Sequence, residues 1–175
     1  MKIAIIGAHS VGKTTLAEAL LENLPGYTLE IEPYYQLEAS GHVFSEAPTA
    51  EDFVDQFNYS AELIAQNKPD VIFDRCVIDL LAYLHAIDPR RDIRSLFETA
   101  QNVVEEIDLI VFVAIEDPDL IPGHDTNLPK LRVKVNDILH DWIQDFDKPV
   151  VEVSGTLLKR TQQVMARISA KRLRV

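Results

Sequence analysis

Residues Gly7 to Thr14 form the pattern with the clearest chemistry in this chain. They read Gly-Ala-His-Ser-Val-Gly-Lys-Thr, which matches GxxxxGK[ST], and they directly follow an apolar run. Gly7 and Gly12 allow a tight turn and a close backbone approach, so that successive N–H groups can face an anion. The ammonium of Lys13 suits the β- and γ-phosphates of a nucleoside triphosphate, and the Thr14 hydroxyl suits Mg²⁺. The pattern predicts a phosphate site at the start of a helix.

The other residues of this loop are expected to bind through their backbone. His9 lies inside the loop, and we expect its side chain to be peripheral to the phosphates. The residues predicted to contact the nucleotide here are Gly7, Ala8, His9, Ser10, Val11, Gly12, Lys13, Thr14 and Thr15.

A second informative segment begins with the apolar run 71–73 and continues with Asp74 and Arg75. In a parallel sheet, ligands collect at the carboxyl ends of the strands. Asp74 is therefore a candidate for holding Mg²⁺ opposite Thr14. The planar guanidinium of Arg75 suits phosphate oxygens. Alternatively, Arg75 pairs with Asp79, which lies four residues later at the start of a helix.

Five β-rich runs alternate with helical patterns along the chain. The predicted strands are Lys2–Ile6, Tyr27–Glu32, Asp70–Asp74, Asp108–Ile115 and Pro149–Val153. Helices are predicted at about 13–24, at 77–87, 93–107 and 128–146, and from about Thr156. A further helix is predicted to begin with Thr49 as its N-cap and to carry Phe53, Phe57, Ala61 and Ile64 on one face at helical spacing. This alternation of apolar strands with helices predicts one doubly wound α/β domain over residues 1–175, with a parallel sheet covered on both faces. The irregular stretches 36–48 and 116–128 are candidate substrate loops or lids.

Composition excludes several classes of function. With 17 basic and 28 acidic residues the net charge is −11, which argues against broad binding to nucleic acid or to an anionic membrane. The one cysteine, Cys76, cannot form an internal disulfide, and this favours a cytoplasmic setting. The histidines do not have zinc-site spacing. The sequence leaves the oligomeric state open, with a dimer among the possibilities.

The segment Asp74-Arg75-Cys76, with Ala82-Tyr83 downstream, resembles segments of the P-loop nucleoside and nucleotide kinases. It is similar to the Asp-Arg-aromatic segment of thymidylate kinases and to the Glu-Arg-Ser segment of deoxyribonucleoside kinases. It is more similar still to the small AAA-like ATPase and kinase domains related to ribosylnicotinamide kinase. The resemblance covers nearly the whole chain. It implies a single P-loop NTPase domain with strand order 2-3-1-4-5.

The resemblance also implies which residues would contact the molecule that accepts the phosphoryl group. Glu32-Pro33 matches the Glu-Pro of deoxyribonucleoside kinases, whose Glu acts near the acceptor hydroxyl as a general base. Independently, a carboxylate at the end of the second strand would face the pocket beside Asp74, although Glu30 competes for this role. Related kinases often carry a base-recognising Gln where this chain has Gln56. An amide can read a nucleobase edge, but a surface position is the alternative for Gln56.

Two further segments complete the predicted site. Residues 116–135 form a candidate lid, and related kinases place Arg there to neutralise the transferring phosphoryl group. Lys130, Arg132 and Lys134 alternate, so a helix would spread them over different faces, and we favour Arg132. Ser154-Gly155-Thr156 resembles the adenine-side loop of P-loop kinases, and it is equally a helix N-cap signal.

These residues predict ATP- and Mg²⁺-dependent phosphoryl transfer to a small acceptor of the nucleoside or nucleotide class. The predicted catalytic residues are Lys13, Glu32, Arg75 and Arg132, with Thr14 and Asp74 for the metal and Glu32, Gln56 and Arg75 for the acceptor. If the acceptor is a monophosphate, Glu32 would only orient it. One alternative is an ATPase that acts as a switch or assembly factor without an acceptor, and a weaker one is a binding module without turnover.

One further sequence match concerns whether the nucleotide is ATP or GTP. Residues 67–70 read Asn-Lys-Pro-Asp and match the guanine-recognition pattern NKxD. Their position between a helix and the third strand argues against that role, which leaves ATP as the expected donor.

Overall fold

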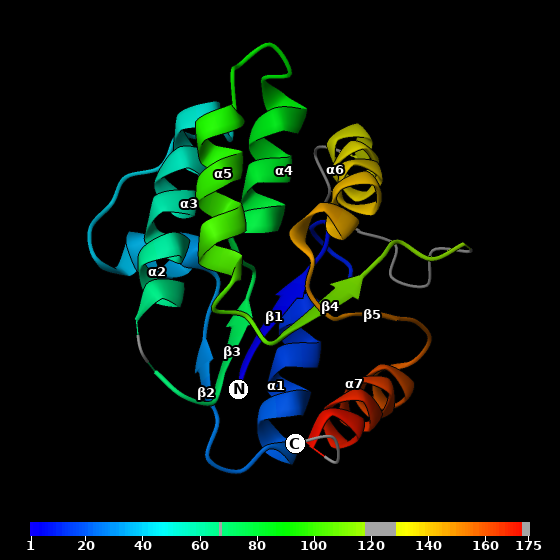
Figure 1. Ribbon diagram of the computed structural model, residues 1–175. Helices are drawn as coiled ribbons and strands as arrows, with labels where there is room; N and C mark the ends of the chain where they lie inside the picture. Colours follow the sequence, from blue (N-terminus) through cyan, green and yellow to red (C-terminus); the bar gives the residue numbers. More distant parts are fainter. Residues whose placement is uncertain (67, 118–128, 173–175) are drawn as a thin grey trace.

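A computed structural model of the chain describes residues 1–66, 68–117 and 129–172 (Figure 1). The strands are β1 (Lys2–Ile6), β2 (Thr28–Glu30), β3 (Val71–Asp74), β4 (Leu109–Val113) and β5 (Val150–Val153). The helices are α1 (Lys13–Asn23), α2 (Pro33–Ala39), α3 (Ala50–Ala65), α4 (Val77–Ile87), α5 (Arg94–Val104), α6 (Pro129–Trp142) and α7 (Leu157–Arg172), with a 3₁₀ turn at Ile143–Phe146.

The described strands form one parallel sheet in the order β2-β3-β1-β4-β5, which confirms the predicted topology. Every residue of β1 and β4 is buried, as expected for central strands covered on both faces. In the register, Ile5 of β1 lies beside Asp74 of β3 on one side and Val111 of β4 on the other. The carboxyl ends of β1 and β3 are therefore adjacent, and this places the loop that begins at Gly7 next to Asp74.

Helices cover both faces of this sheet (Figure 1). α1 and α7 lie together on one face, and α3, α4, α5 and α6 pack around one another on the other. The buried side chains of α3 include Phe53, Phe57 and Ile64, at the helical spacing that the sequence predicted. No helix in the described ranges is both long enough and apolar enough to cross a membrane.

The start of α3 confirms that Thr49 is its N-cap. The backbone N–H of Asp52 donates to Thr49 Oγ1 at 3.3 Å, and the backbone N–H of Thr49 donates to the Asp52 carboxylate at 2.8 Å. This reciprocal pair is a capping box, which satisfies two of the amides left unpaired at a helix start.

The region after β2 differs from its prediction. β2 ends at Glu30 instead of Glu32, and α2 occupies the first part of the stretch expected to be irregular. Pro33 explains the change, because its fixed φ suits the first position of a helix and its missing N–H costs nothing there. Glu32 is thus the residue that precedes α2 and does not end a strand. Smaller differences occur at α5, which ends at Val104, and at α6, whose last predicted turn is the 3₁₀ segment.

Candidate active site

The loop after β1 has a backbone that requires its glycines. A Cβ on Gly7 would overlap the carbonyl oxygen of Val113, and the φ of Gly7 is +153°. Gly12, at φ 87° and ψ 27°, stands in the left-handed region immediately before α1. Side-chain-bearing residues rarely adopt these conformations, so the two glycines set the shape of the loop.

Two cationic side chains donate hydrogen bonds to backbone carbonyl oxygens of this loop. Lys13 Nζ donates to the carbonyl of Ala8 at 2.6 Å. From α6, Arg132 donates through Nε to the carbonyl of His9 at 3.0 Å and through a terminal nitrogen to that of Ser10 at 3.2 Å. Lys13 and Arg132 are both buried. The structure therefore brings Arg132 against the loop, while its role toward the phosphoryl group stays a prediction.

The ammonium of Lys13 lies in surroundings that disfavour its charge. Burial and the neighbouring Arg75 lower its pKa to about 8, although Asp79, Glu32 and Asp74 act in the opposite direction. Anionic phosphates would counter both of the lowering effects. A phosphate ligand would therefore raise the pKa of Lys13 back toward its usual value.

Thr14 and Asp74 meet at the predicted metal position. Thr14 Oγ1 donates to one carboxylate oxygen of Asp74 at 2.6 Å. The other oxygen of Asp74 is buried and has no hydrogen-bond partner among the described residues, and burial raises the pKa of this carboxyl. Mg²⁺ at phosphate sites takes one or two protein oxygens and keeps water or phosphate as its other ligands. An orphaned carboxylate oxygen beside a hydroxyl fits that requirement.

Arg75 combines a strained backbone with a buried ion pair. Its φ is +78°, which costs a residue with a side chain on the order of 1–3 kcal/mol. Its Nε donates to Glu32 at 2.5 Å, while a terminal nitrogen is 3.5 Å from Asp79. Burial alone would lower the pKa of Arg75, but Glu32, Tyr83 and Asp79 raise it above its usual value. The predicted alternative, pairing with Asp79, is present but is the longer of the two contacts.

Glu32 and Glu30 have different surroundings, although they are two residues apart. Glu32 lines a cavity beside the phosphate loop, where its carboxylate faces Arg75. Glu30 instead bonds to Lys68 at 2.9 Å at the edge of the sheet. The geometry places Glu32, and not its competitor, beside Asp74 and Arg75.

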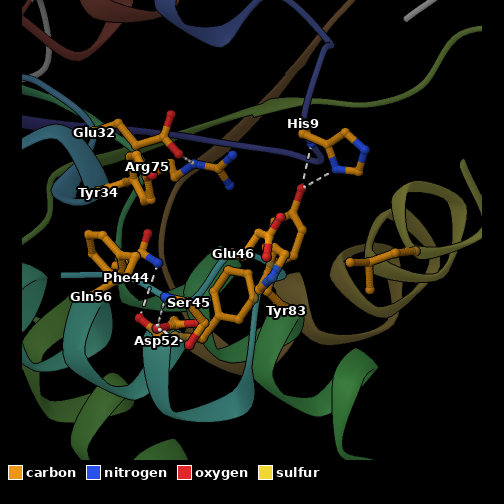
Figure 2. A pocket seen from close by; sticks show the side chains of 13 residues that line it. His9, Glu32, Tyr34, Phe44, Ser45, Glu46, Asp52, Gln56, Arg75 and Tyr83 are labelled. Atoms are coloured by element: carbon orange, nitrogen blue, oxygen red, sulfur yellow. Dashed lines mark hydrogen bonds and ion pairs between the residues drawn. The ribbon is translucent and has the colours of Figure 1, made fainter. Parts of the chain in front are cut away.

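The cavity beside the loop has a volume of about 390 Å³. Its walls include two stacked aromatic pairs: the ring centroids of Tyr34 and Phe44 are 4.4 Å apart, and those of Phe53 and Tyr83 are 5.0 Å apart. Figure 2 shows Glu32 and Arg75 joined at one end of the cavity. This size is in the range typical of small-molecule sites.

Gln56 lies in the wall of this cavity. It is only 5% exposed, so the surface position that was its alternative is wrong. Its Nε2 donates to the carbonyl of Asp52, one turn earlier in α3, at 3.1 Å, and this bond fixes the amide.

His9 makes a contact that the sequence did not predict. Its backbone N–H donates to the hydroxyl of Tyr83 at 2.5 Å, and its Nδ1 lies 2.8 Å from the same oxygen (Figure 2). Burial, together with Arg75, Lys13 and Arg132, lowers the pKa of His9 to about 4. A neutral His9 therefore joins the phosphate loop to the cavity wall.

The predicted adenine side lies at the ends of β4 and β5. A second cavity, of about 320 Å³, is lined there by residues that include Ser154 and Gly155. The N–H of Gly155 donates to Glu116 at 2.5 Å. Thr156 Oγ1 accepts from the N–H of Lys159 at 3.4 Å, in agreement with the N-cap interpretation.

Sequence reasoning missed Arg160 of α7, which connects this side to the phosphate loop. It donates to the carbonyl of Val11 at 2.7 Å and to Glu116 at 3.2 Å, and it is 5% exposed. Its sequence signal is weak, because a basic residue in an amphipathic helix usually faces solvent. Tyr83 was quoted in the kinase-like segment but was given no role.

The candidate lid is described only in part. Residues 118–128 lie outside the described residues, and 129–135 belong to α6. On this helix Arg132 is buried, whereas Lys130 and Lys134 are exposed, so the three basic residues diverge as predicted. Lys134 donates to the carbonyl of Ala86 at the end of α4. The lid itself stays a prediction.

The fold and the loop define a P-loop domain of the kind found in nucleoside and nucleotide kinases. The model of an AAA domain family matches residues 2–160, and the chain belongs to this family. A search of curated proteins found no match.

Solved structures of kinases share the fold. Deoxyadenosine kinase from M. mycoides superposes with a TM-score of 0.67 at 16% identity, covering 97% of this chain and 100% of that one. Thymidylate kinase from Candida albicans gives 0.67 at 18%, covering 98% and 92%. NadR protein in complex with NR gives 0.69 at 16%, covering 95% of this chain and 50% of that one. At sequence identities this low, the similarity to these structures shows a shared fold alone.

Proposed function

We propose that this protein transfers the γ-phosphoryl group of ATP, with Mg²⁺, to a small acceptor that is a nucleoside or a nucleotide. One observation carries the proposal: an aromatic-walled cavity opens beside the phosphate loop, with Glu32 and Arg75 between them. A switch ATPase without an acceptor needs the loop and Asp74 but has no use for this cavity.

For a hydroxyl acceptor the reaction balances as a single displacement. The acceptor oxygen forms a bond to the γ-phosphorus, and the bond from that phosphorus to the β,γ-bridging oxygen breaks, so that ADP leaves with the electron pair. The hydroxyl proton passes to the carboxylate of Glu32, which acts as the general base. For a monophosphate acceptor the attacking oxygen is already anionic, and Glu32 only orients it.

The cations have separate tasks in this scheme. Lys13 and the loop amides bind the β- and γ-phosphates, while Arg132, held against the loop carbonyls, neutralises charge on the transferring group. Arg75 aligns Glu32 and lies beside the acceptor. Mg²⁺, held by Thr14 and Asp74, would supply further neutralisation of the phosphates.

The nucleotide base is assigned to the second cavity, beside Ser154, Gly155 and Thr156. The short contact from the Gly155 N–H to Glu116 fixes the loop that would border the base. This assignment makes the two cavities the donor and acceptor sides of one site, with the phosphate loop between them.

The proposal is tested by ADP release from Mg-ATP in the presence of nucleosides, nucleoside monophosphates and nicotinamide riboside. We expect at least one acceptor to raise the rate well above the rate without acceptor, and Lys13→Ala to abolish the increase. Release that no compound accelerates would favour the ATPase alternative. Full activity of Lys13→Ala would remove the phosphate loop from the mechanism.

A further inference from the structure

On the basis of the proposed function, we infer that the acceptor is an uncharged nucleoside and not a nucleoside monophosphate. The inference comes from the charges that surround the acceptor cavity and from the shape of its walls. It narrows the acceptor class that the proposed transfer leaves open.

The cavity offers little positive charge to a second phosphate. Among the described residues that line it, Arg75 is the one permanent cation, and it is already paired with Glu32 at 2.5 Å and with Asp79 at 3.5 Å. His9 also lines the cavity, but its pKa of about 4 leaves it neutral at pH 7. A phosphate dianion would have to take Arg75 away from two carboxylates.

Other nearby cations are committed elsewhere. Lys13 and Arg132 donate to carbonyl oxygens of the phosphate loop, where the donor nucleotide is expected, and neither lines the cavity. Segment 118–128, whose sequence includes Asp119 and Asp125, contains no Lys or Arg. That part of the candidate lid therefore offers no Lys or Arg side chain to an acceptor phosphate.

Negative charge, by contrast, is abundant in the walls. Glu32, Glu46 and Asp52 all line the cavity. Hydrogen bonds from Thr49 and Ser45 lower the pKa of Asp52 although its burial acts to raise it, so this group is ionised at pH 7. Three carboxylates against one guanidinium repel a dianion, whereas a neutral ligand avoids this cost.

The walls suit a flat, uncharged ring with a hydroxyl at one end. Stacked Tyr34 and Phe44 come from α2 and the segment after it, and stacked Phe53 and Tyr83 come from α3 and α4. Aromatic faces stack on nucleobases, and the Gln56 amide can bond to a base edge. Figure 2 shows Glu32 and Arg75 apart from Gln56 within the same cavity, so that a base beside Gln56 directs its sugar toward Glu32.

The experiment compares matched pairs of uncharged nucleosides and their 5′-monophosphates: thymidine, deoxycytidine, deoxyadenosine and deoxyguanosine. At saturating Mg-ATP we measure kcat/KM for transfer, and by calorimetry we measure binding of each compound to the full chain without ATP. We expect the best nucleoside to exceed its monophosphate about tenfold or more in both measurements, because the monophosphate meets uncompensated negative charge.

Charge reversal in the wall provides a second readout. Glu46→Lys adds a cation to the lining without touching the residues assigned to transfer, and it should lower the nucleoside-to-monophosphate ratio about three- to tenfold. Glu22→Lys makes the same charge change at an exposed position of α1, outside the cavity, and should leave the ratio unchanged.

The outcomes separate this inference from the proposed function. Preferred transfer to a nucleoside, with the shift in Glu46→Lys, supports both. Transfer restricted to monophosphates, or an equal shift in the two charge variants, overturns the inference and leaves phosphoryl transfer standing. Transfer to no compound overturns both.

Discussion

At the scale of single residues, surroundings decide which of two similar carboxylates can do chemistry. Glu30 and Glu32 lie on the same short stretch, yet Glu30 is bonded to Lys68 at the sheet edge while Glu32 meets Arg75 at the cavity. Because Glu32 lies at the cavity beside the phosphate loop, its position supports the proposal that it is the general base.

This difference gives a matched pair of variants. Glu32→Gln removes the base and should lower kcat for a hydroxyl acceptor by about 10²-fold or more. Glu30→Gln makes the same chemical change away from the cavity and should be close to wild type. Steady-state kinetics of both variants make the check, and equal kinetics for the two would remove Glu32 from the mechanism.

Replacing Asp74 should raise the stability of the protein but weaken its use of Mg²⁺. Its raised pKa means that the charged carboxylate is disfavoured by folding, so this group's contribution to stability is lost as pH rises toward neutrality. Asp74→Asn removes that penalty and keeps an acceptor for Thr14, so at pH 7 we expect a higher Tm. The Mg²⁺ concentration for half-maximal activity should rise about tenfold. An unchanged Mg²⁺ requirement would exclude Asp74 as a metal ligand.

The lowered pKa of Lys13 predicts that nucleotide binding depends on pH. With a pKa of about 8 in the free protein, Lys13 becomes neutral as pH rises above that value, and binding of ADP must then take up a proton. Affinity should fall above pH 8, approaching tenfold per pH unit, and stay flat below about pH 7. Calorimetry in buffers of different ionisation enthalpy measures the proton uptake, and its absence at pH 9 would contradict the lowered pKa.

Some of these residues could be predicted from sequence and others could not. The phosphate loop and Asp74 belong to local patterns whose spacing carries their chemistry, whereas Arg132 was proposed from the resemblance to related kinases. Arg160 acts on Val11 across 149 positions of sequence, and only the packing of α7 against α1 brings them together. No local pattern encodes such a contact.

At the scale of elements, helices α1, α6 and α7 each contribute one cation to the loop carbonyls. Lys13, Arg132 and Arg160 reach the carbonyls of Ala8, His9, Ser10 and Val11. The shape of the loop therefore depends on how these helices pack, and it is not set by the glycines alone.

Arg160→Met tests this dependence. The change leaves the half-buried Glu116 without its cation and frees the Val11 carbonyl, and it should cost on the order of 2 kcal/mol of unfolding free energy. The KM for ATP should rise more than the KM for the acceptor. Arg167→Met removes an exposed arginine from the same helix and serves as the control. Denaturant unfolding and kinetics provide the readouts, and equal KM increases for both substrates would count against a role on the donor side.

Element types were more predictable than element boundaries. The apolar strands and the capped α3 follow from periodicity and from Thr49, whereas the early end of β2 depended on recognising Pro33 as a helix start. The cavity could not be predicted, because its walls come from α2, α3, α4 and the segment between α2 and α3.

At the scale of the whole molecule, the sheet order places two cavities around one phosphate loop, and we propose these as the donor side and the acceptor side. The strand order places β1 at the centre, with β3 and Asp74 on one side and β4 and β5 on the other. The aromatic cavity lies toward α3 and α4, and the second cavity lies at the ends of β4 and β5. The central claim is that phosphate moves between these two sides.

The most direct test follows the labelled γ-phosphate of ATP in the presence of Mg²⁺ and the nucleoside panel. The account predicts that label appears on a nucleoside in step with ADP release and that Glu32→Gln suppresses it. Label found only in inorganic phosphate, at a rate that no acceptor changes, would contradict phosphoryl transfer and identify the protein as an ATPase.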